Sequence, residues 1–416
     1  MTASPAMSGR LRLCGRKVEE EIMMEFKNEV AIVGMGCTKF GEIWDKDVND
    51  LIIEACYEAF EDAGIRANDL EAAWWSTMLS GELGRSLAYP LKTDYIPITR
   101  VENRCAGGQD AFLNACFSVA AGVYDLVLVC GAEKLKDSGI PAAGMDPTTP
   151  YTSRGDTLFV PPVIFGQFAQ RYFHHYGIDP KEGKEILAKI AVKNHHNGTL
   201  TPKAQFQKEI TIEQVLNAPL VAPPLGLFDC CGVSDGGAAA IITRTDLAKR
   251  YRDDFLVVKG FGVSTGHYQA QIQDDWDLVH IEENVRASKK AYEMAGIKNP
   301  REEIDLAVVH DCFTITELVI CEDLGFSAPG KGKDDVMAGT FELTGDLPVN
   351  TDGGLKCFGH PVGASGLRML YEVYKQIQGK AGERQIKDAK TGLVHGLGGT
   401  VVDSSTAVVI IVGEPE

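Results

Sequence analysis

Hydrophobic residues in the first part of the chain form short runs that alternate with longer amphipathic stretches. The run at 30–34 predicts a buried strand, and apolar residues at helical spacing over 48–63, followed by Gly64, predict a helix with a glycine C-cap. Because strands and helices alternate, we expect a buried, largely parallel sheet flanked by helices. The same alternation predicts further strands at 70–76, 95–101 and 125–131, and an apolar helix over 111–121.

The same order of elements begins again near residue 255. A strand at 256–262 precedes a helix at 285–295, and the tripeptide Ala63-Gly64-Ile65 recurs as Ala295-Gly296-Ile297. Such a series indicates a duplicated α/β unit. It continues with a strand at 304–309, a glycine-rich turn into a long helix at 353–374, and closing strands within 393–412.

This pattern divides the chain into an N-terminal extension and two halves. Residues 1–28 are interpreted as a loose extension, 29–250 as the first half and 251–416 as the second half. Within the first half, residues at about 133–225 are rich in proline and in aromatic and polar stretches. Long irregular insertions in α/β proteins usually form lids or pocket walls, so we interpret this region as an inserted, substrate-binding loop domain.

Composition excludes several classes of protein. With 416 residues, 44% hydrophobic and 24% charged, the chain has the composition of a globular protein that can hold two or three domains. A net charge of −17 argues against nucleic acid or an anionic membrane as the main partner. No run of ~18 apolar residues predicts a membrane span. The 11 cysteines show no C-x-x-C pair, which favours a reduced, cytoplasmic protein without a disulfide framework or a zinc site.

Cys105 is the first candidate for chemistry. It lies in Asn103-Arg104-Cys105-Ala106-Gly107-Gly108, between a predicted strand and a predicted apolar helix. A thiol at a helix N-terminus has its pKa lowered by the helix dipole, which makes a thiolate nucleophile available. The alternative interpretation is a buried structural cysteine, a common role for a free thiol.

Three later stretches follow predicted strands, at the edge where ligands bind in α/β sheets. They are His310-Asp311-Cys312-Phe313, the segment 356–366 that contains His360, and His395-Gly396-Leu397-Gly398-Gly399. Together with Cys105 they supply a nucleophile, a second thiol and several imidazoles. That set suits acyl transfer through a thioester, in which a histidine accepts the thiol proton and N–H donors hold the oxyanion.

Other motifs are interpreted as structural or are absent from the sequence. Cys321, Cys357 and the adjacent pair Cys230-Cys231 are assigned to packing, since neighbouring cysteines suit neither metal chelation nor an easy disulfide. No metal site is predicted. The phosphate-loop pattern G-x-x-x-x-G-K-[ST] is absent, and no G-x-G-x-x-G opens a helix after the first strand, which disfavours ATP or NAD as a cofactor.

Four motifs together resemble the thiolase superfamily, and the resemblance covers about Glu29 to Val412. The branch it resembles is that of the sterol-carrier-protein-type and archaeal thiolases, because His-Asp-Cys-Phe stands where other thiolases carry Asn-Glu-Ala-Phe. The motifs are Asn-Arg-Cys-Ala-Gly-Gly at Cys105, His310-Asp311-Cys312-Phe313, Gly359-His360-Pro361-x-Gly363-Ala364, and Asp229-Cys230-Cys231 followed by Ser234-Asp235-Gly236.

The resemblance implies a fold and a set of roles. The fold would be two βαβαβαββ halves in a five-layered α/β/α/β/α arrangement with an inserted loop domain. Cys105 would be the acylated nucleophile, His360 its activating base, and His310 a group near the oxyanion, while the N–H groups of Cys105 and Gly398 would form a second oxyanion hole. The family's second catalytic cysteine is absent, since Gly396-Leu397-Gly398 stands in its place. Cys312 is the substitute that this branch suggests.

The resemblance also implies substrates and partners. CoA and an acyl-CoA would be the substrates, with no other bound cofactor, and the chain would form a homodimer or a dimer of dimers. Members of the archaeal-type branch often work with a small separate subunit, a zinc ribbon joined to an OB-fold. This chain contains no such module, so the resemblance predicts one as a separate partner, with function of the single chain as the alternative.

The expected reaction is CoA-dependent cleavage of a 3-oxoacyl-CoA, or the reverse Claisen condensation. Acetoacetyl-CoA and a bulky or aromatic substrate such as benzoylsuccinyl-CoA both stay open. Aromatic residues of the insertion either line a roomy pocket or belong to the core: Tyr151, Phe159, Phe165, Phe168, Tyr172 and Phe173. Two other functions are alternatives, a decarboxylating ketoacyl synthase and a non-catalytic lipid carrier or scaffold subunit.

Overall fold

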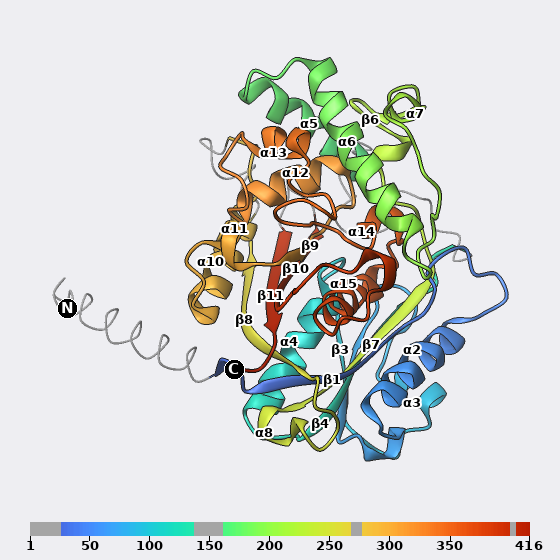
Figure 1. Ribbon diagram of the computed structural model, residues 1–416. Coiled ribbons are helices and arrows are strands. Elements are labelled where there is room, and N and C mark those ends of the chain that lie inside the picture. The colour runs from blue at the N-terminus through green and yellow to red at the C-terminus, as the bar shows by residue number, and fades with distance from the viewer. Residues whose placement is uncertain (1–25, 137–160, 268–276, 400–404) are drawn as a thin grey trace, which may run out of the picture.

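The two halves of the chain arrange their strands in the same order. A computed structural model describes residues 26–136, 161–267, 277–399 and 405–416. Its main sheet has nine strands in the order β3-β2-β4-β7-β1-β8-β11-β10-β9, joined at its centre by β1 and β8 (Figure 1). The strands are β1 Val30–Cys37, β2 Ala72–Ser76, β3 Ile98–Val101, β4 Leu126–Glu133, β7 Gly236–Arg244, β8 Leu256–Thr265, β9 Leu306–Val308, β10 Thr391–Gly399 and β11 Ser405–Gly413.

Reading outward from the centre, β1, β7, β4 and β2 on one side match β8, β11, β10 and β9 on the other. The partner of β3 in the second half is reduced to a parallel bridge between Ala307 and Val349. A separate two-stranded sheet pairs β5 (Leu220–Ala222) with β6 (Leu225–Gly226). The α/β class predicted from the alternating pattern is therefore confirmed, and the duplication is visible in the strand order.

The sheet is mixed, which corrects the prediction of a largely parallel one. Strand β2 is parallel to β3 and β4, and β9 is parallel to β10, whereas the other five pairs are antiparallel. Each half closes with a strand that runs back beside its predecessor: β7 returns beside β4, and β11 beside β10. Strands buried on both faces form continuous apolar runs in either direction, so the sequence pattern does not reveal this reversal.

Helices cover the sheet on both faces and fill the space between its halves. Helices α4 and α15 each contact strands of both halves, whereas α2 lies on the outer face of the first half and α10 on that of the second. This gives the α/β/α/β/α succession of layers. The helices are α2 Val48–Ala63, α3 Arg85–Leu91, α4 Gly107–Ala120, α5 Pro161–His175, α6 Pro180–Thr199, α7 Ile212–Leu216, α8 Thr245–Ala248, α10 Glu282–Ala295, α11 Pro300–Glu303, α12 Thr314–Asp323, α13 Gly332–Ala338, α14 Gly354–Cys357 and α15 Val362–Ile377.

The same glycine pair seats the first helix of each half on its strand. In each strand a Cβ at either glycine would come within 2.5 Å of a helix carbonyl oxygen, so only glycine permits this close packing. Both helices then end at a left-handed glycine, with φ 70° at Gly64 and 80° at Gly296. The paired glycines are Gly34 and Gly36 against α2, and Gly260 and Gly262 against α10.

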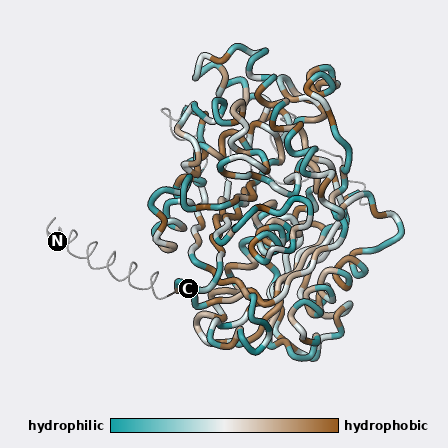
Figure 2. The backbone as a smooth tube through the Cα atoms, viewed as in Figure 1, coloured by the Kyte–Doolittle hydropathy of each residue, from teal (hydrophilic) through white to brown (hydrophobic). Residues whose placement is uncertain are grey.

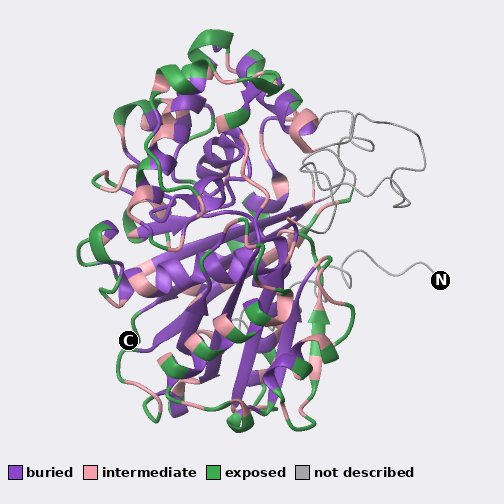
Figure 3. Cartoon of the chain, turned by 90° about the vertical axis from the view of Figure 1, so that its right-hand side faces the viewer, coloured by how far each residue is buried: buried purple, intermediate pink, exposed green. Residues whose placement is uncertain are grey.

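Hydrophobic residues concentrate in the inner strands and helices (Figure 2), and the strands of the main sheet other than the edge strand β3 are mostly buried (Figure 3). Phe26 packs edge-on against Phe117 and Phe261, so residues 26–28, which the sequence pattern assigned to the extension, contact the folded chain. The division of the chain at residues 28 and 250 stays a prediction.

Over the part of the chain that the structure describes, no helix is long and apolar enough to cross a membrane.

The insertion contributes α5, α6 and α7 at one end of the molecule (Figure 1). Helix α6 packs with α12 and α13, α5 packs with α12, and α7 packs on α6. Of the two interpretations left open above, the described aromatic residues fit the core. Phe165, Phe168, Tyr172 and Phe173 are all buried there, and Phe165 stacks on Phe313 with ring centroids 4.7 Å apart. Tyr151 and Phe159 lie outside the described residues.

Candidate active site

Cys105 lies in the tight turn that joins β3 to α4. Arg104, just before it, has φ 50°, a left-handed conformation that non-glycine residues rarely adopt and that clusters at functional sites. The turn is closed by two backbone hydrogen bonds, from Ala106 N to Asn103 O at 3.1 Å and from Gly107 N to Arg104 O at 2.9 Å. These bonds fix the direction in which the thiol projects.

His360, from the other half of the chain, contacts this thiol directly. Its Nε2 lies 3.1 Å from Cys105 Sγ, and its Nδ1 lies 2.7 Å from Ser365 Oγ. Because the Ser365 hydroxyl donates to Pro361 O at 2.9 Å, its oxygen is left to accept the Nδ1 proton of His360. The imidazole therefore directs an unprotonated Nε2 at the thiol, which is the tautomer that a general base requires.

Burial keeps this pair neutral. It raises the pKa of the Cys105 thiol to about 12, although neighbouring Arg104 acts in the opposite direction. Burial, assisted by the positive charge of Arg368, lowers the pKa of His360 to about 3. The thiol pKa was expected to fall at the helix N-terminus, and that expectation is wrong, because desolvation of the thiolate outweighs the backbone N–H groups. Proton transfer from Cys105 to His360 thus has to accompany attack on a substrate.

His310 completes a compact cluster with these two residues. One side-chain ligand atom from each of Cys105, His310 and His360 lies within 4.8 Å of the other two. The His310 and His360 rings meet edge to face, with centroids 5.4 Å apart. Burial, together with the neighbouring His360, lowers the pKa of His310 well below its usual value, so His310 is neutral.

His395 stands behind His310 and positions its backbone. The His310 N–H donates to His395 Nδ1 at 3.5 Å, and His395 Nε2 donates to Asn284 Oδ1 at 2.9 Å. Asn284 in turn donates to Asp323 Oδ2 at 2.9 Å. The chain of contacts runs from α12 through α10 and β10 to His310, and it gives His395 a positioning role outside the cluster.

Cys312 lies next to the cluster and is almost fully buried. Its Sγ is 3.9 Å from Thr316 Oγ1, and its carbonyl accepts the Cys231 N–H at 2.9 Å. Burial raises the pKa of the Cys312 thiol well above its usual value, and the nearby thiols of Cys231 and Cys105 act in the same direction. Cys231, assigned to packing from the sequence, is therefore close to both candidate catalytic thiols.

Gly398 lies against the Cys105 turn, in β10. A Cβ at this position would come 2.1 Å from Asn103 O and 3.0 Å from Ala106 N, both backbone atoms. No side chain therefore fits at residue 398 while the turn keeps its form.

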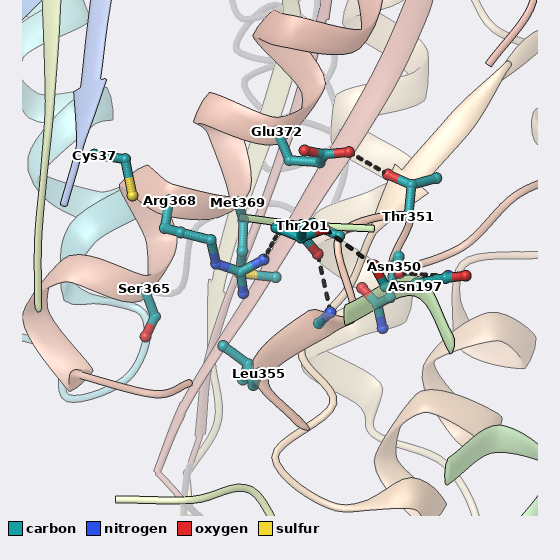
Figure 4. A network of polar contacts seen from close by, with 12 residues as sticks. Cys37, Asn197, Thr201, Asn350, Thr351, Leu355, Ser365, Arg368, Met369 and Glu372 are labelled. Carbon is teal, nitrogen blue, oxygen red and sulfur yellow. Dashed lines mark hydrogen bonds and ion pairs between the residues drawn. The ribbon is translucent and has the colours of Figure 1, made fainter. Parts of the chain in front are cut away.

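A buried ionic network joins α15, the helix that follows His360, to the segment 350–354. Figure 4 shows Arg368 and Glu372 projecting from α15 toward Asn350 and Thr351. Arg368 and Asp352 form an ion pair in which both side chains are fully buried, and Thr351 donates to Glu372 at 2.7 Å. These bonds fasten the segment 350–354 to the helix whose first turn contains Ser365.

Asp311 anchors the same segment from the other side. Its carboxylate accepts from Leu355 N at 2.5 Å and from Asn194 Nδ2 at 2.9 Å. The sequence indicated neither this contact nor the roles of Ser365, His395 and Arg368. His395 did stand in one of the three candidate stretches, and Ser365 follows His360 by five positions at the start of a predicted helix.

Comparisons with known proteins agree with this geometry. A family model for the thiolase N-terminal domain matches residues 30–246, and one described as thiolase C-terminal domain-like matches 264–411. The chain belongs to the thiolase family. This thiolase is an acyltransferase, and the resemblance stated from the sequence motifs is confirmed.

Individual relatives support the same assignment. The acetyl-CoA acetyltransferase of Methanothermobacter thermautotrophicus is 37% identical over 89% of this chain and 97% of its own length. Sterol carrier protein 2 of Gallus gallus is 31% identical over 94% of this chain and 73% of its own. The solved Ltp2-ChsH2(DUF35) aldolase is similar with a TM-score of 0.81 at 27% identity, covering 94% of this chain and 98% of the other.

The neutral Cys105–His360 pair predicts a distinctive pH dependence of alkylation. The rate at which iodoacetamide modifies Cys105 should rise about tenfold per pH unit from pH 7 to 9, because only the thiolate reacts. Peptide mapping by mass spectrometry would follow Cys105, with Cys230 as an internal comparison whose pKa burial raises to about 11. A plateau already at neutral pH would show a preformed thiolate–imidazolium pair instead.

Gly398→Ala should displace the Cys105 turn, because the new methyl group would meet backbone atoms. Overpacking of this kind costs about 1–3 kcal/mol, and a misplacement of about 1 Å can slow a reaction about 100-fold. Denaturant unfolding and the rate of Cys105 acylation would measure both effects. Gly41→Ala is the matched control, since a Cβ there meets nothing within 4 Å. Equal acylation rates in the two variants would contradict the contact.

Asp352→Asn should destabilise the fold by about 3–5 kcal/mol, because it leaves the Arg368 charge buried without its partner. The double variant Asp352→Asn/Arg368→Met should recover much of that loss. Asp246→Asn, which removes an exposed partner of Arg244, is the control and should leave the free energy of unfolding close to that of wild type. Urea unfolding measures the stability of all three variants. Equal losses of unfolding free energy in Asp352→Asn and Asp246→Asn would show that the buried pair contributes no more to stability than the exposed one.

Proposed function

We propose that this thiolase cleaves a 3-oxoacyl-CoA with CoA, or runs the reverse Claisen condensation, through an acyl thioester on Cys105. The 3.1 Å contact between Cys105 Sγ and His360 Nε2 carries the proposal. It pairs a nucleophile with a base of the correct tautomer, and Ser365 orients that base, which is the arrangement that nucleophilic catalysis requires.

The first half-reaction transfers an acyl group to Cys105. As Sγ attacks the thioester carbonyl, the thiol proton moves to His360 Nε2. Collapse of the tetrahedral intermediate forms the Cys105 thioester and expels the CoA sulfur, which takes up that proton. His310 and the N–H groups of Cys105 and Gly398 are proposed to hold the oxyanions.

The second half-reaction needs a group that removes the α-proton of an acyl-CoA. Cys312 is proposed for this role because its thiol lies beside the cluster, near that of Cys105. Because burial keeps the Cys312 thiol protonated, it first gives its own proton to His360 and then, as the thiolate, takes the α-proton. The resulting enolate attacks the Cys105 thioester, forming the C–C bond and releasing the Cys105 sulfur, which takes up the proton held by His360. In cleavage the same steps run in reverse.

The proposal is less specific about the substrate and the partners than about the reaction. Phe165 and Phe313 are both buried and stack on each other, so they do not distinguish a small from a bulky acyl chain, and acetoacetyl-CoA and benzoylsuccinyl-CoA both remain candidates. The similar Ltp2 chain is described together with a DUF35 protein, which supports a small zinc-ribbon/OB-fold subunit as the partner here. The edge strand β3 exposes Thr99 and Arg100, which favours pairing in a homodimer.

The proposal predicts two separable defects. After brief incubation with acetyl-CoA, benzoyl-CoA or succinyl-CoA, wild type should carry an acyl mass on the peptide of Cys105, and Cys105→Ser should carry none. Cys312→Ala should acylate normally but lose about 100- to 10,000-fold in C–C bond formation, as expected for removal of a general base. Cys230→Ser, a thiol outside the cluster, is the matched control.

The alternatives give other outcomes in the same experiment. A ketoacyl synthase would need a malonyl donor for condensation, and a carrier would show no acyl-enzyme at all. An aldolase, the activity in the name of the similar Ltp2-ChsH2(DUF35) structure, would cleave its substrate without CoA or an acyl-enzyme. Acylation of Cys105→Ser to the wild-type extent would sink the proposal.

A further inference from the structure

The cluster of Cys105, His310 and His360 has a second chemical property. One thiol and two imidazoles from three separate segments converge, with ligand atoms that all lie within 4.8 Å of one another. Thiolate and imidazole are the ligands that zinc prefers, and three protein ligands with an open fourth position are typical of reactive zinc sites. We propose that these three residues bind one zinc ion, or a similar soft divalent transition metal, and that the metal competes with the acyl group for the sulfur of Cys105.

The distances are close to those of a tetrahedral site. Zinc–sulfur and zinc–nitrogen bonds of about 2.3 and 2.1 Å place sulfur and nitrogen about 3.6 Å apart, and two nitrogens about 3.4 Å apart. Cys105 Sγ and His360 Nε2 are 3.1 Å apart, so the metal needs that pair to open by about 0.5 Å. Two imidazoles on one tetrahedral ion have ring centroids about 5 Å apart, and those of His310 and His360 are 5.4 Å apart.

The surroundings orient His360 as metal ligands are oriented. A metal-binding histidine donates its other ring N–H to a neighbouring group, which leaves the lone pair of the first nitrogen on the metal. Ser365 Oγ accepts from His360 Nδ1 at 2.7 Å, so the lone pair of Nε2 faces the cluster. The backbone of His310 is fixed independently through His395. Few degrees of freedom are therefore lost when a metal binds.

The fourth position lies on the open side of the cluster, since Cys105 is the partly exposed member and both histidines are buried. Coordination would break the S–H bond of Cys105, form a sulfur–metal bond and release the proton to solvent. Because the acyl thioester needs the same sulfur, metal and acyl group exclude each other. Binding of the metal does not depend on the proposed function, whereas its inhibitory consequence does.

Cobalt(II) is the probe, because a thiolate ligand gives it a charge-transfer band in the near ultraviolet and tetrahedral coordination gives it strong visible bands. Titration of the full-length, metal-free protein should show both, with one ion per chain, and zinc should displace the cobalt and abolish the bands. Cys105→Ser should remove the charge-transfer band, and His310→Ala should weaken zinc binding at least about 100-fold. Ser365→Ala, which removes only the group that orients His360, should weaken it about 10- to 100-fold.

Two matched controls separate this site from chance binding elsewhere. Cys230→Ser removes a half-buried thiol outside the cluster, and His196→Ala removes an exposed imidazole that pairs with Glu209. Both variants should bind cobalt as wild type does, and acylation of Cys105 before titration should prevent binding. A charge-transfer band that persists in Cys105→Ser, or zinc affinity unchanged in His310→Ala, would overturn the proposal. If wild-type protein binds the metal but is never acylated at Cys105, the proposed function is refuted and the metal site stands.

Discussion

The close approach of α4 and α15 is the constraint on which the rest of the site depends. The two helices start from different halves of the chain, and glycines hold their N-terminal turns together. A Cβ at Gly108 of α4 would lie 3.0 Å from Gly363 O, and one at Gly366 of α15 would lie 2.7 Å from Gln109 N. Without this contact between backbones, Cys105 at the start of one helix and His360 at the start of the other would not come within hydrogen-bonding distance.

Burial then decides the chemistry of the pair. A thiol and an imidazole that are both desolvated stay uncharged, since each ion would lose hydration that the site does not replace. In the proposed reaction, activation is therefore left to the substrate, whose developing oxyanion would be stabilised at the moment the proton moves. The supporting bonds from Ser365, His395 and the Arg368–Asp352 pair lower the cost of that step, because they hold the groups in place beforehand.

The same preorganisation suits a metal ion as well as a transition state. A base held with its lone pair toward a thiol, beside a second fixed imidazole, offers the donor atoms that zinc selects. His310 supplies the second nitrogen of the three ligand atoms, beside the nitrogen of His360 and the sulfur of Cys105. The residue proposed to hold an oxyanion is thus also the residue proposed to complete the metal site.

The sequence by itself determined the α/β class, the repeated order of elements and the position of Cys105 at a strand-to-helix turn. These features are local, because they follow from hydrophobic periodicity, glycine positions and short motifs. Tertiary structure decided the directions of the strands, the raised pKa of Cys105, and the positions of Ser365, His395 and Arg368 around the histidines. Each of these depends on which distant segments meet and on how much water their contact excludes, and neither quantity is encoded in the pattern of any single stretch.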